Sequence, residues 1–236
     1  MRCKYNICTG NGFTFGENPA THEMEAIPCK CRLERDEQLD DERYKRKLLE
    51  AGISPVFWDL TLDGYKALAI GSTTTRQANH AIVKIIEEFI VDPDKFITNY
   101  TTFWLWSAMG NSGCTSLAII FAMELIKKNY KVKFITMQNL LNAFVEFDNK
   151  KIYFKELDYA QIYFLDNTFV SGRCHLKGEY TGVQLYNWLN EGLVKDKRFI
   201  CTSRTELSKV DKIYEHSVGV LKKCVLSLEI QGTLYG

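Results

Sequence analysis

The stretch of sequence that most constrains the fold runs from Phe103 to Met137. It opens with the apolar and aromatic residues 103–106, which predict a buried strand. A loop with two glycines follows at 110–116, and the apolar run from Leu117 to Ile126 predicts a buried helix. After a short turn, Val132 to Thr136 predict a second buried strand. This strand–loop–helix–strand order predicts a βαβ unit whose loop presents backbone N–H groups at a helix N-terminus, an arrangement suited to binding phosphate.

The loop itself departs from the P-loop motif G-x-x-x-x-G-K-[ST], in which the lysine contacts the β- and γ-phosphates and the hydroxyl holds Mg²⁺. Its residues are Gly110, Asn111, Ser112, Gly113, Cys114, Thr115 and Ser116. A Gly-Lys pair inserted after Cys114 would complete the motif. We therefore interpret the loop as a P-loop that lacks two residues, one of them the lysine. The alternative is an ordinary tight turn in an α/β sheet, and the loop alone does not decide between the two.

Composition restricts the class of protein. The chain has 236 residues, 46% hydrophobic and 25% charged, which suits one sizeable core with a small appendage. No apolar run reaches the roughly 18 residues needed to cross a bilayer, and the N-terminus lacks a signal-peptide pattern, so we expect a cytoplasmic protein with no membrane partner. The formal net charge of +1 gives no overall attraction to nucleic acid, so such binding would need local patches.

Four of the eight cysteines cluster near the N-terminus. Cys3 and Cys8 form one close pair, Cys29 and Cys31 form another, and a glycine-bearing loop separates the pairs. In a reducing compartment this pattern favours a Cys₄ zinc site over disulfides, because thiolates at short spacing can bind one ion tetrahedrally. The metal would replace the core that so short a segment cannot build. The alternative is four reduced, metal-free cysteines.

The sequence next predicts a domain boundary. The segment from Arg32 to Ala51 is densely charged and predicts a solvated helix, which Gly52 and Pro55 end. We therefore assign 1–55 to a zinc-binding and helical region and 56–236 to the main domain. Within the latter, apolar residues recur every three to four positions from 75 to 90, which predicts an amphipathic helix before the central strand.

The remaining elements complete an α/β pattern. The segment 160–167 predicts an apolar strand that carries Asp166 at its C-terminal end, where ligands bind in open α/β sheets. An aspartate roughly fifty residues after a glycine loop stands where a Walker-B magnesium ligand is expected, although such a residue is often only a turn or cap. A helix at 180–194 and strands at 198–203 and 224–230 follow.

The order of these pieces resembles that of the DnaC/DnaI-type helicase loaders and the related IstB-type transposition ATPases, within the AAA+ group. The resemblance covers nearly the whole chain. It rests on the N-terminal C…C-x-G-x-G…C-x-C element, the charged helix with G-I-x-P-x-F after it, the T-x-L-A helix start, the F-L-D strand and the F-I-C-T-S strand. It implies a P-loop AAA+ domain with a mainly parallel central sheet flanked by helices, preceded by a small zinc-knuckle and helix region.

The resemblance also implies a function. Members of this family are ATP-driven proteins of DNA replication that bind the replicative helicase through their N-terminal region and single-stranded DNA through their AAA+ domain. ATP or ADP with Mg²⁺ would be the cofactors, and a partner loader or self-assembly into an AAA+ oligomer is a further expectation. Lys, Ile, Asn and Tyr usage and the compact size favour a phage or mobile element as the source.

Several positions depart from the family pattern. The loop lacks its lysine, Asn167 replaces the second Walker-B acid, and Arg204 replaces a polar sensor residue. The expected arginine finger falls on Gly219. Placed charges supply nearly all the stabilisation in phosphoryl transfer, and an arginine finger alone is worth about 10³–10⁵ in rate. We therefore expect slow or absent hydrolysis at a site built from Asp166, Asn167, Arg204 and the loop 110–116.

Three functional hypotheses follow. We prefer a loader-like replication protein with an eroded ATPase site, the second is a competent ATP-dependent loader or IstB-like ATPase, and the third is a zinc-bearing interaction adaptor with no role on DNA. DNA contacts would use basic residues with aromatic neighbours, although a solvated surface explains the same residues equally well. The candidates are Lys127, Lys128 and Lys131 after the loop helix, and Lys150, Lys151, Tyr153 and Lys155 further on.

Overall fold

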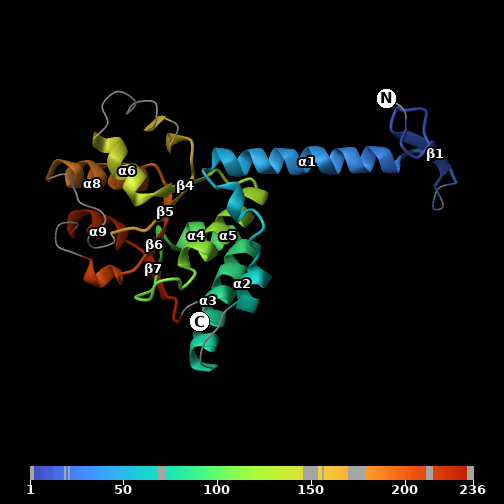
Figure 1. Cartoon of the computed structure of the whole chain (residues 1–236). Helices are drawn as coiled ribbons and strands as arrows, with labels where there is room; N and C mark the ends of the chain where they lie inside the picture. Colours follow the sequence, from blue (N-terminus) through green and yellow to red (C-terminus); the bar gives the residue numbers. More distant parts are fainter. Residues whose placement is uncertain are drawn as a thin grey trace. The chain divides into compact units, whose positions relative to one another are not determined.

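The computed structural model describes residues 3–18, 20, 22–68, 73–145, 154–155, 157–169, 179–210 and 215–232. The chain divides into two compact units, Met1–Lys47 (unit 1) and Leu48–Gly236 (unit 2), as Figure 1 shows by colour along the sequence. That residues 1–55 act as a separate region stays a prediction. None of the helices in the described ranges is both long and apolar enough to cross a membrane.

Unit 1 consists of a hairpin followed by a charged helix. Strands β1 (Phe13–Glu17) and β2 (Met24–Pro28) pair antiparallel. The helix α1 (Lys30–Glu50), whose last turn enters unit 2, confirms the helix predicted at 32–51. Ion pairs one turn apart, such as Lys45–Asp41 at 2.6 Å, stabilise this exposed helix by a few tenths of a kcal/mol each.

Unit 2 is built on a five-stranded, fully parallel sheet, which confirms the predicted sheet type. The strands lie in the order β4-β5-β6-β3-β7, so β3, the strand that leads into the glycine loop, lies between β6 and β7. Their bounds are β3 Thr102–Trp106, β4 Val132–Thr136, β5 Ile162–Asp166, β6 Arg198–Ser203 and β7 Val225–Glu229. The first four are nearly continuous apolar runs, as strands buried on both faces require.

Helices cover both faces of this sheet (Figure 1). One layer holds α2 (Leu62–Leu68), α3 (Thr73–Val91), α4 (Pro93–Asn99) and α5 (Cys114–Lys127). The other holds α6 (Met137–Val145), α8 (Glu179–Val194) and α9 (Glu215–Leu221), and short 3₁₀ turns lie at Pro55–Phe57 and Leu207–Lys209. Helix α4 was not predicted, and Pro93 occupies the first turn of this helix, where its missing N–H costs no hydrogen bond.

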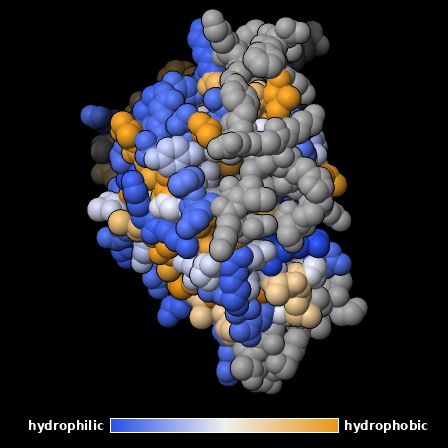
Figure 2. All heavy atoms as spheres, turned by 90° about the vertical axis from the view of Figure 1, so that its left-hand side faces the viewer, coloured by the Kyte–Doolittle hydropathy of each residue, from blue (hydrophilic) through white to orange (hydrophobic). Residues whose placement is uncertain are grey.

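The core has two halves because successive strand residues point to opposite faces. Phe103 joins an aromatic cluster under α3, α4 and α5, with ring centroids 6.0 Å from Phe89 and 6.1 Å from Phe121. The next residue, Trp104, stacks on Phe169 at 6.2 Å within the apolar cluster under α6, α8 and α9. Figure 2 views unit 2 from the α6, α8 and α9 side, where the coloured surface is mainly hydrophilic with small separate hydrophobic groups.

Candidate nucleotide site and candidate metal centre

The glycine loop between β3 and α5 ends in a left-handed residue. Gly113 is the N-cap of α5 with φ at 84°, a conformation that a side chain disfavours. Its carbonyl accepts the N–H of Leu117 at 2.9 Å and starts the helical hydrogen-bond ladder. The N–H groups of the first turn of α5 have no intrahelical acceptor, and they carry the positive end of the helix dipole.

Asp166, at the C-terminal end of β5, anchors a network of polar side chains beside this loop. Its Oδ1 accepts hydrogen bonds from the hydroxyls of Thr115 at 2.7 Å and Thr202 at 2.6 Å. Its Oδ2 accepts one from the side-chain amide of Asn167 at 2.8 Å. The carboxylate is only 6% exposed, so these three donors satisfy a buried charge that would otherwise be costly.

The Thr115–Asp166 contact aligns Thr115 with the hydroxyl residue of the P-loop motif. In P-loop NTPases the motif Ser/Thr and the Walker-B Asp hold the magnesium ion together, so Thr115 takes the motif hydroxyl position. Counting back from Thr115 along the motif without a gap places Cys114 at the lysine position, Gly113 at the second glycine and Ala108 at the first glycine. On this alignment the lysine and the first glycine are replaced by single residues without a gap, which agrees with the start of α5 at Gly113. The interpretation that two residues are missing also places Thr115 at the motif hydroxyl, and it stays a prediction.

Loop and strand ends enclose a cavity of about 300 Å³. Ser107, Met109, the loop residues 110–116, Asn167, Thr202, Ser203 and Arg204 line it. Among these lining residues Arg204 is the one Lys or Arg, and its side chain is exposed. The loop residues, Asn167 and Arg204 thus share one cavity, next to the buried Asp166.

Cys114 cannot supply the charge that the motif lysine supplies. Its Sγ lies 3.3 Å from the hydroxyl oxygen of Ser112 and is buried. Desolvation raises the pKa of this thiol to about 11, so it is neutral at physiological pH. The cavity therefore combines backbone donors and hydroxyls with a neutral residue at the lysine position.

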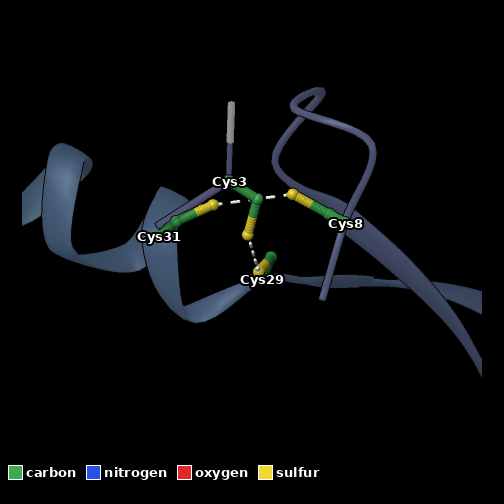
Figure 3. Close-up of side chains that lie close together, drawn as sticks. All are labelled: Cys3, Cys8, Cys29 and Cys31. Carbon is green, nitrogen blue, oxygen red and sulfur yellow. Dashed lines mark hydrogen bonds between the residues drawn. The ribbon is translucent and has the colours of Figure 1, made fainter. Parts of the chain in front are cut away.

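The four clustered cysteines converge in unit 1 (Figure 3). Their Sγ atoms all lie within 4.8 Å of one another, with Cys3–Cys29 at 3.8 Å and Cys8–Cys31 at 3.6 Å. Four sulfurs bound tetrahedrally to zinc at about 2.3 Å would be about 3.8 Å apart, so the donor set fits this ion. The hairpin brings the pairs together because the N–H of Cys29, after β2, bonds to the Gly12 carbonyl at 2.9 Å.

The surroundings shift the thiol acidities in opposite directions. A hydrogen bond from the Cys8 backbone lowers the pKa of Cys3 to about 6, whereas desolvation raises the pKa of Cys31 to about 12. Backbone donors at a thiolate are the kind of supporting contact that orients metal ligands.

Comparisons with known proteins locate the fold. No protein-family model matches the sequence, and no curated protein matches it. Solved structures do match. AMPPCP-bound DnaA from Aquifex aeolicus matches with a TM-score of 0.58 at 16% identity, over 74% of this chain and 50% of that chain. The DnaC helicase loader matches with a TM-score of 0.57 at 16% identity, over 75% of this chain and 100% of that chain. DnaI matches with a TM-score of 0.59 at 11% identity, over 76% of this chain and 92% of that chain. The chain has a DnaC/DnaI-like AAA+ fold.

This result confirms the predicted fold, and at such identities the likeness concerns the fold alone. The chain spans half the length of the DnaA structure. The fold also shows two site residues that the sequence analysis missed. Thr202 and Ser203 were treated only as part of an apolar strand, although they end β6 beside Asp166 at the carboxyl edge of the sheet, where ligands bind.

The role of the candidate lysines in DNA contact stays a prediction, and the structure shows which groups lie next to those that it describes. Lys127 pairs with Glu124 at 2.6 Å, and Lys128 donates to the Val91 carbonyl at 3.1 Å, both at the C-terminal end of α5. The Nζ atom of Lys131 lies over the exposed ring of Tyr159, 4.2 Å from the ring centroid. Lys150, Lys151 and Tyr153 lie outside the described residues.

Lys155 lies elsewhere, at a second cavity of about 580 Å³ beside α6 and α8. Aromatic side chains, including Tyr163 and Trp188 with ring centroids 4.9 Å apart, line this cavity. Tyr163 is the second residue of β5, so the cavity lies toward the amino ends of the strands, away from Asp166.

Proposed function

We propose that this chain is a helicase-loader-type protein of DNA replication whose AAA+ domain binds a nucleotide but hydrolyses it slowly or not at all. The observation that carries the proposal is the Thr115–Asp166 pair beside the glycine loop, with Cys114 and Asn167 in place of the lysine and the second acid. Loop amides at a helix N-terminus suffice to bind phosphate. Hydrolysis requires charges placed around the transferring phosphoryl group, and those are depleted here.

The proposed partners are a replicative helicase, contacted through unit 1, and single-stranded DNA, contacted through the AAA+ domain. Support comes from the likeness to a helicase loader and to a DnaA structure with single-stranded DNA bound. Unit 1 also exposes large apolar side chains on its hairpin, such as Phe15 at 72% and Met24 at 66%. Apolar groups left in water on so small a unit are typical of a protein contact surface.

Zinc is the proposed metal of the four-cysteine cluster. When bound, it would supply folding free energy to unit 1, since Cys₄ zinc sites are structural and leave no coordination position for a reactant. Cys3, Cys8, Cys29 and Cys31 would be its ligands.

The test compares ATP binding with ATP turnover in the purified chain. We expect a fluorescent ATP analogue to bind in the presence of Mg²⁺ while steady-state hydrolysis, with and without single-stranded DNA, stays near background. Thr115→Val should weaken Mg²⁺-dependent binding, and Thr61→Val, at an exposed threonine that does not line the cavity, serves as the matched control. An ATP turnover rate of about 1 s⁻¹, the low end of ordinary enzyme rates, would contradict the proposal of slow or absent hydrolysis and favour a competent ATP-dependent loader.

Co-purification tests the partner. A tagged full-length chain expressed with the hexameric helicase of its source should retain that helicase on the column. Absence of both helicase and single-stranded DNA binding would contradict the loader proposal and favour the zinc-bearing interaction adaptor.

A further inference from the structure

The phosphate cavity lacks the cation that its loop should provide. Loop amides and the dipole of α5 contribute partial charges, equivalent to about half an elementary charge at a helix N-terminus. A triphosphate carries several full negative charges, and P-loops neutralise them with a lysine as well as Mg²⁺. Cys114 stands at the lysine position, and burial keeps it neutral by raising its pKa. A working cavity therefore needs a positive charge from another element.

Arg204 is the one Lys or Arg among the described residues that line the cavity. It enters from the end of β6, a different strand from the one that leads into the loop. The parallel pairing of β3 with β6 sets Ser203 beside Trp106, and the Ser107 N–H donates to the Ser203 carbonyl at 3.1 Å. The residue after Ser203 is thereby held next to the residue that opens the loop.

Hydrogen bonds fix the backbone on both sides of Arg204. The Ser203 hydroxyl donates to the Thr168 carbonyl at 2.7 Å and accepts the Thr205 N–H at 3.1 Å. The Thr205 carbonyl in turn accepts the indole N–H of the buried Trp104 at 3.1 Å. The backbone from which the Arg204 side chain projects is therefore held in place on both sides.

The guanidinium itself is available for a ligand. Within the described ranges no acidic group forms an ion pair with Arg204, whereas Arg198 at the other end of β6 is committed to Asp196 and to the Ile97 carbonyl. The nearby carboxylate of Asp166 already has three neutral donors, Thr115, Thr202 and Asn167. Among the described residues, the cavity thus has one cationic side chain without an ion pair, Arg204, near a carboxylate whose hydrogen bonds are already made, Asp166.

We propose that Arg204 replaces the motif lysine as the cation of this cavity and binds the terminal phosphate of a nucleoside triphosphate. The inference rests on the proposed nucleotide binding. The loop amides and the guanidinium would hold the phosphates, because the planar fork of arginine can donate two parallel hydrogen bonds to phosphate oxygens. Because the motif lysine contacts the β- and γ-phosphates, a guanidinium in its place would act on the distal phosphates, and the site would favour a triphosphate over a diphosphate.

The experiment measures the Kd of fluorescent ATP and ADP analogues for the full-length chain and five variants: R204A, R204K, C114K, C114K/R204A and the control R43A. Arg43 is an exposed arginine on α1. We expect R204A to weaken ATP binding at least about tenfold and ADP binding much less, a loss in the range of a charge-assisted hydrogen bond. R204K should fall in between, R43A should bind like the wild type, and C114K should restore ATP affinity in the R204A background.

Three outcomes overturn the inference, and they differ in what else they affect. R204A binding ATP within twofold of the wild type would remove Arg204 and leave the proposed function intact. Binding by C114K but not by the wild type would show that Arg204 does not replace the lysine, although the loop is competent. Binding by none of the proteins, each shown to be folded by circular dichroism, would reject the nucleotide site itself.

Discussion

At the scale of single residues, Cys114 is the largest departure from a working phosphate loop. A lysine there would place an ammonium beside the phosphates, whereas the thiol is small, buried and neutral. The same burial protects it chemically, since the thiolate is the nucleophilic form and desolvation disfavours it. Under the proposed function, the positive charge in the cavity would come from Arg204 and a bound metal ion rather than from the loop.

Thiol labelling checks the state of Cys114. Its pKa is raised to about 11, so the proton stays on sulfur at all lower pH values, and labelling should increase only as the pH approaches that value. In a short maleimide pulse at about pH 7.5, exposed Cys224 should react while Cys114 stays largely unmodified, as read by peptide mass spectrometry. Equal labelling of the two residues would contradict a buried, protonated thiol.

At the scale of elements, the start of α5 determines how the loop functions. Gly113 takes the left-handed conformation that directs the chain from the loop into the helix. Gly110, which appeared from the sequence to be the first glycine of the motif, has no such φ and has no atoms within 4 Å of an added Cβ. The two glycines therefore differ in what they contribute, although the sequence pattern treats them alike.

Alanine substitution at the two glycines should separate these roles. Gly113→Ala forces a side chain into the left-handed region and should lower the free energy of unfolding by about 1–2 kcal/mol, with weaker nucleotide binding. Gly110→Ala is the matched control and should stay within about 0.5 kcal/mol. Urea denaturation and ATP titration measure both effects, and equal losses for the two variants would argue against the Gly113 register.

At the scale of the whole molecule, the two units obtain their stability from different sources. Unit 2 buries aromatic and aliphatic side chains on both faces of its sheet. Unit 1 has a two-stranded hairpin with exposed apolar residues, and a lone hairpin is marginally stable in water. Its four converging sulfurs supply what its core lacks if they bind an ion, because metal binding free energy then becomes folding free energy.

Metal removal should therefore affect unit 1 alone. Zinc content of about one ion per chain is expected, and a chelator or Cys29→Ser should unfold the hairpin while unit 2 keeps its unfolding transition. Backbone NMR spectra and thermal unfolding followed by circular dichroism distinguish the two units. Cys224→Ser, at an exposed cysteine outside the cluster, is the control. Metal-free protein that is indifferent to chelators would favour four reduced, unliganded cysteines.

Sequence patterns alone predicted the strands of the sheet and most of the long helices, whereas they did not predict α4 or the β1–β2 hairpin. Apolar runs, glycines and charged stretches set the bounds of β4 and β6 to the residue and those of α1 and α8 to within two residues, because burial and helix propensity act locally. The cysteine spacing selected the same four residues whose sulfurs converge. Each of these inferences needs only neighbours along the chain.

Only the tertiary structure decided which of these pieces touch. The strand order sets β6 between β3 and β5, and this brings the hydroxyl of Thr202 onto Asp166 and Arg204 to the mouth of the loop. The same packing joins Thr115 to Asp166. Such contacts join residues 36 and 51 positions apart in the chain, and their pairing follows from how two helical layers pack on one sheet rather than from local preference.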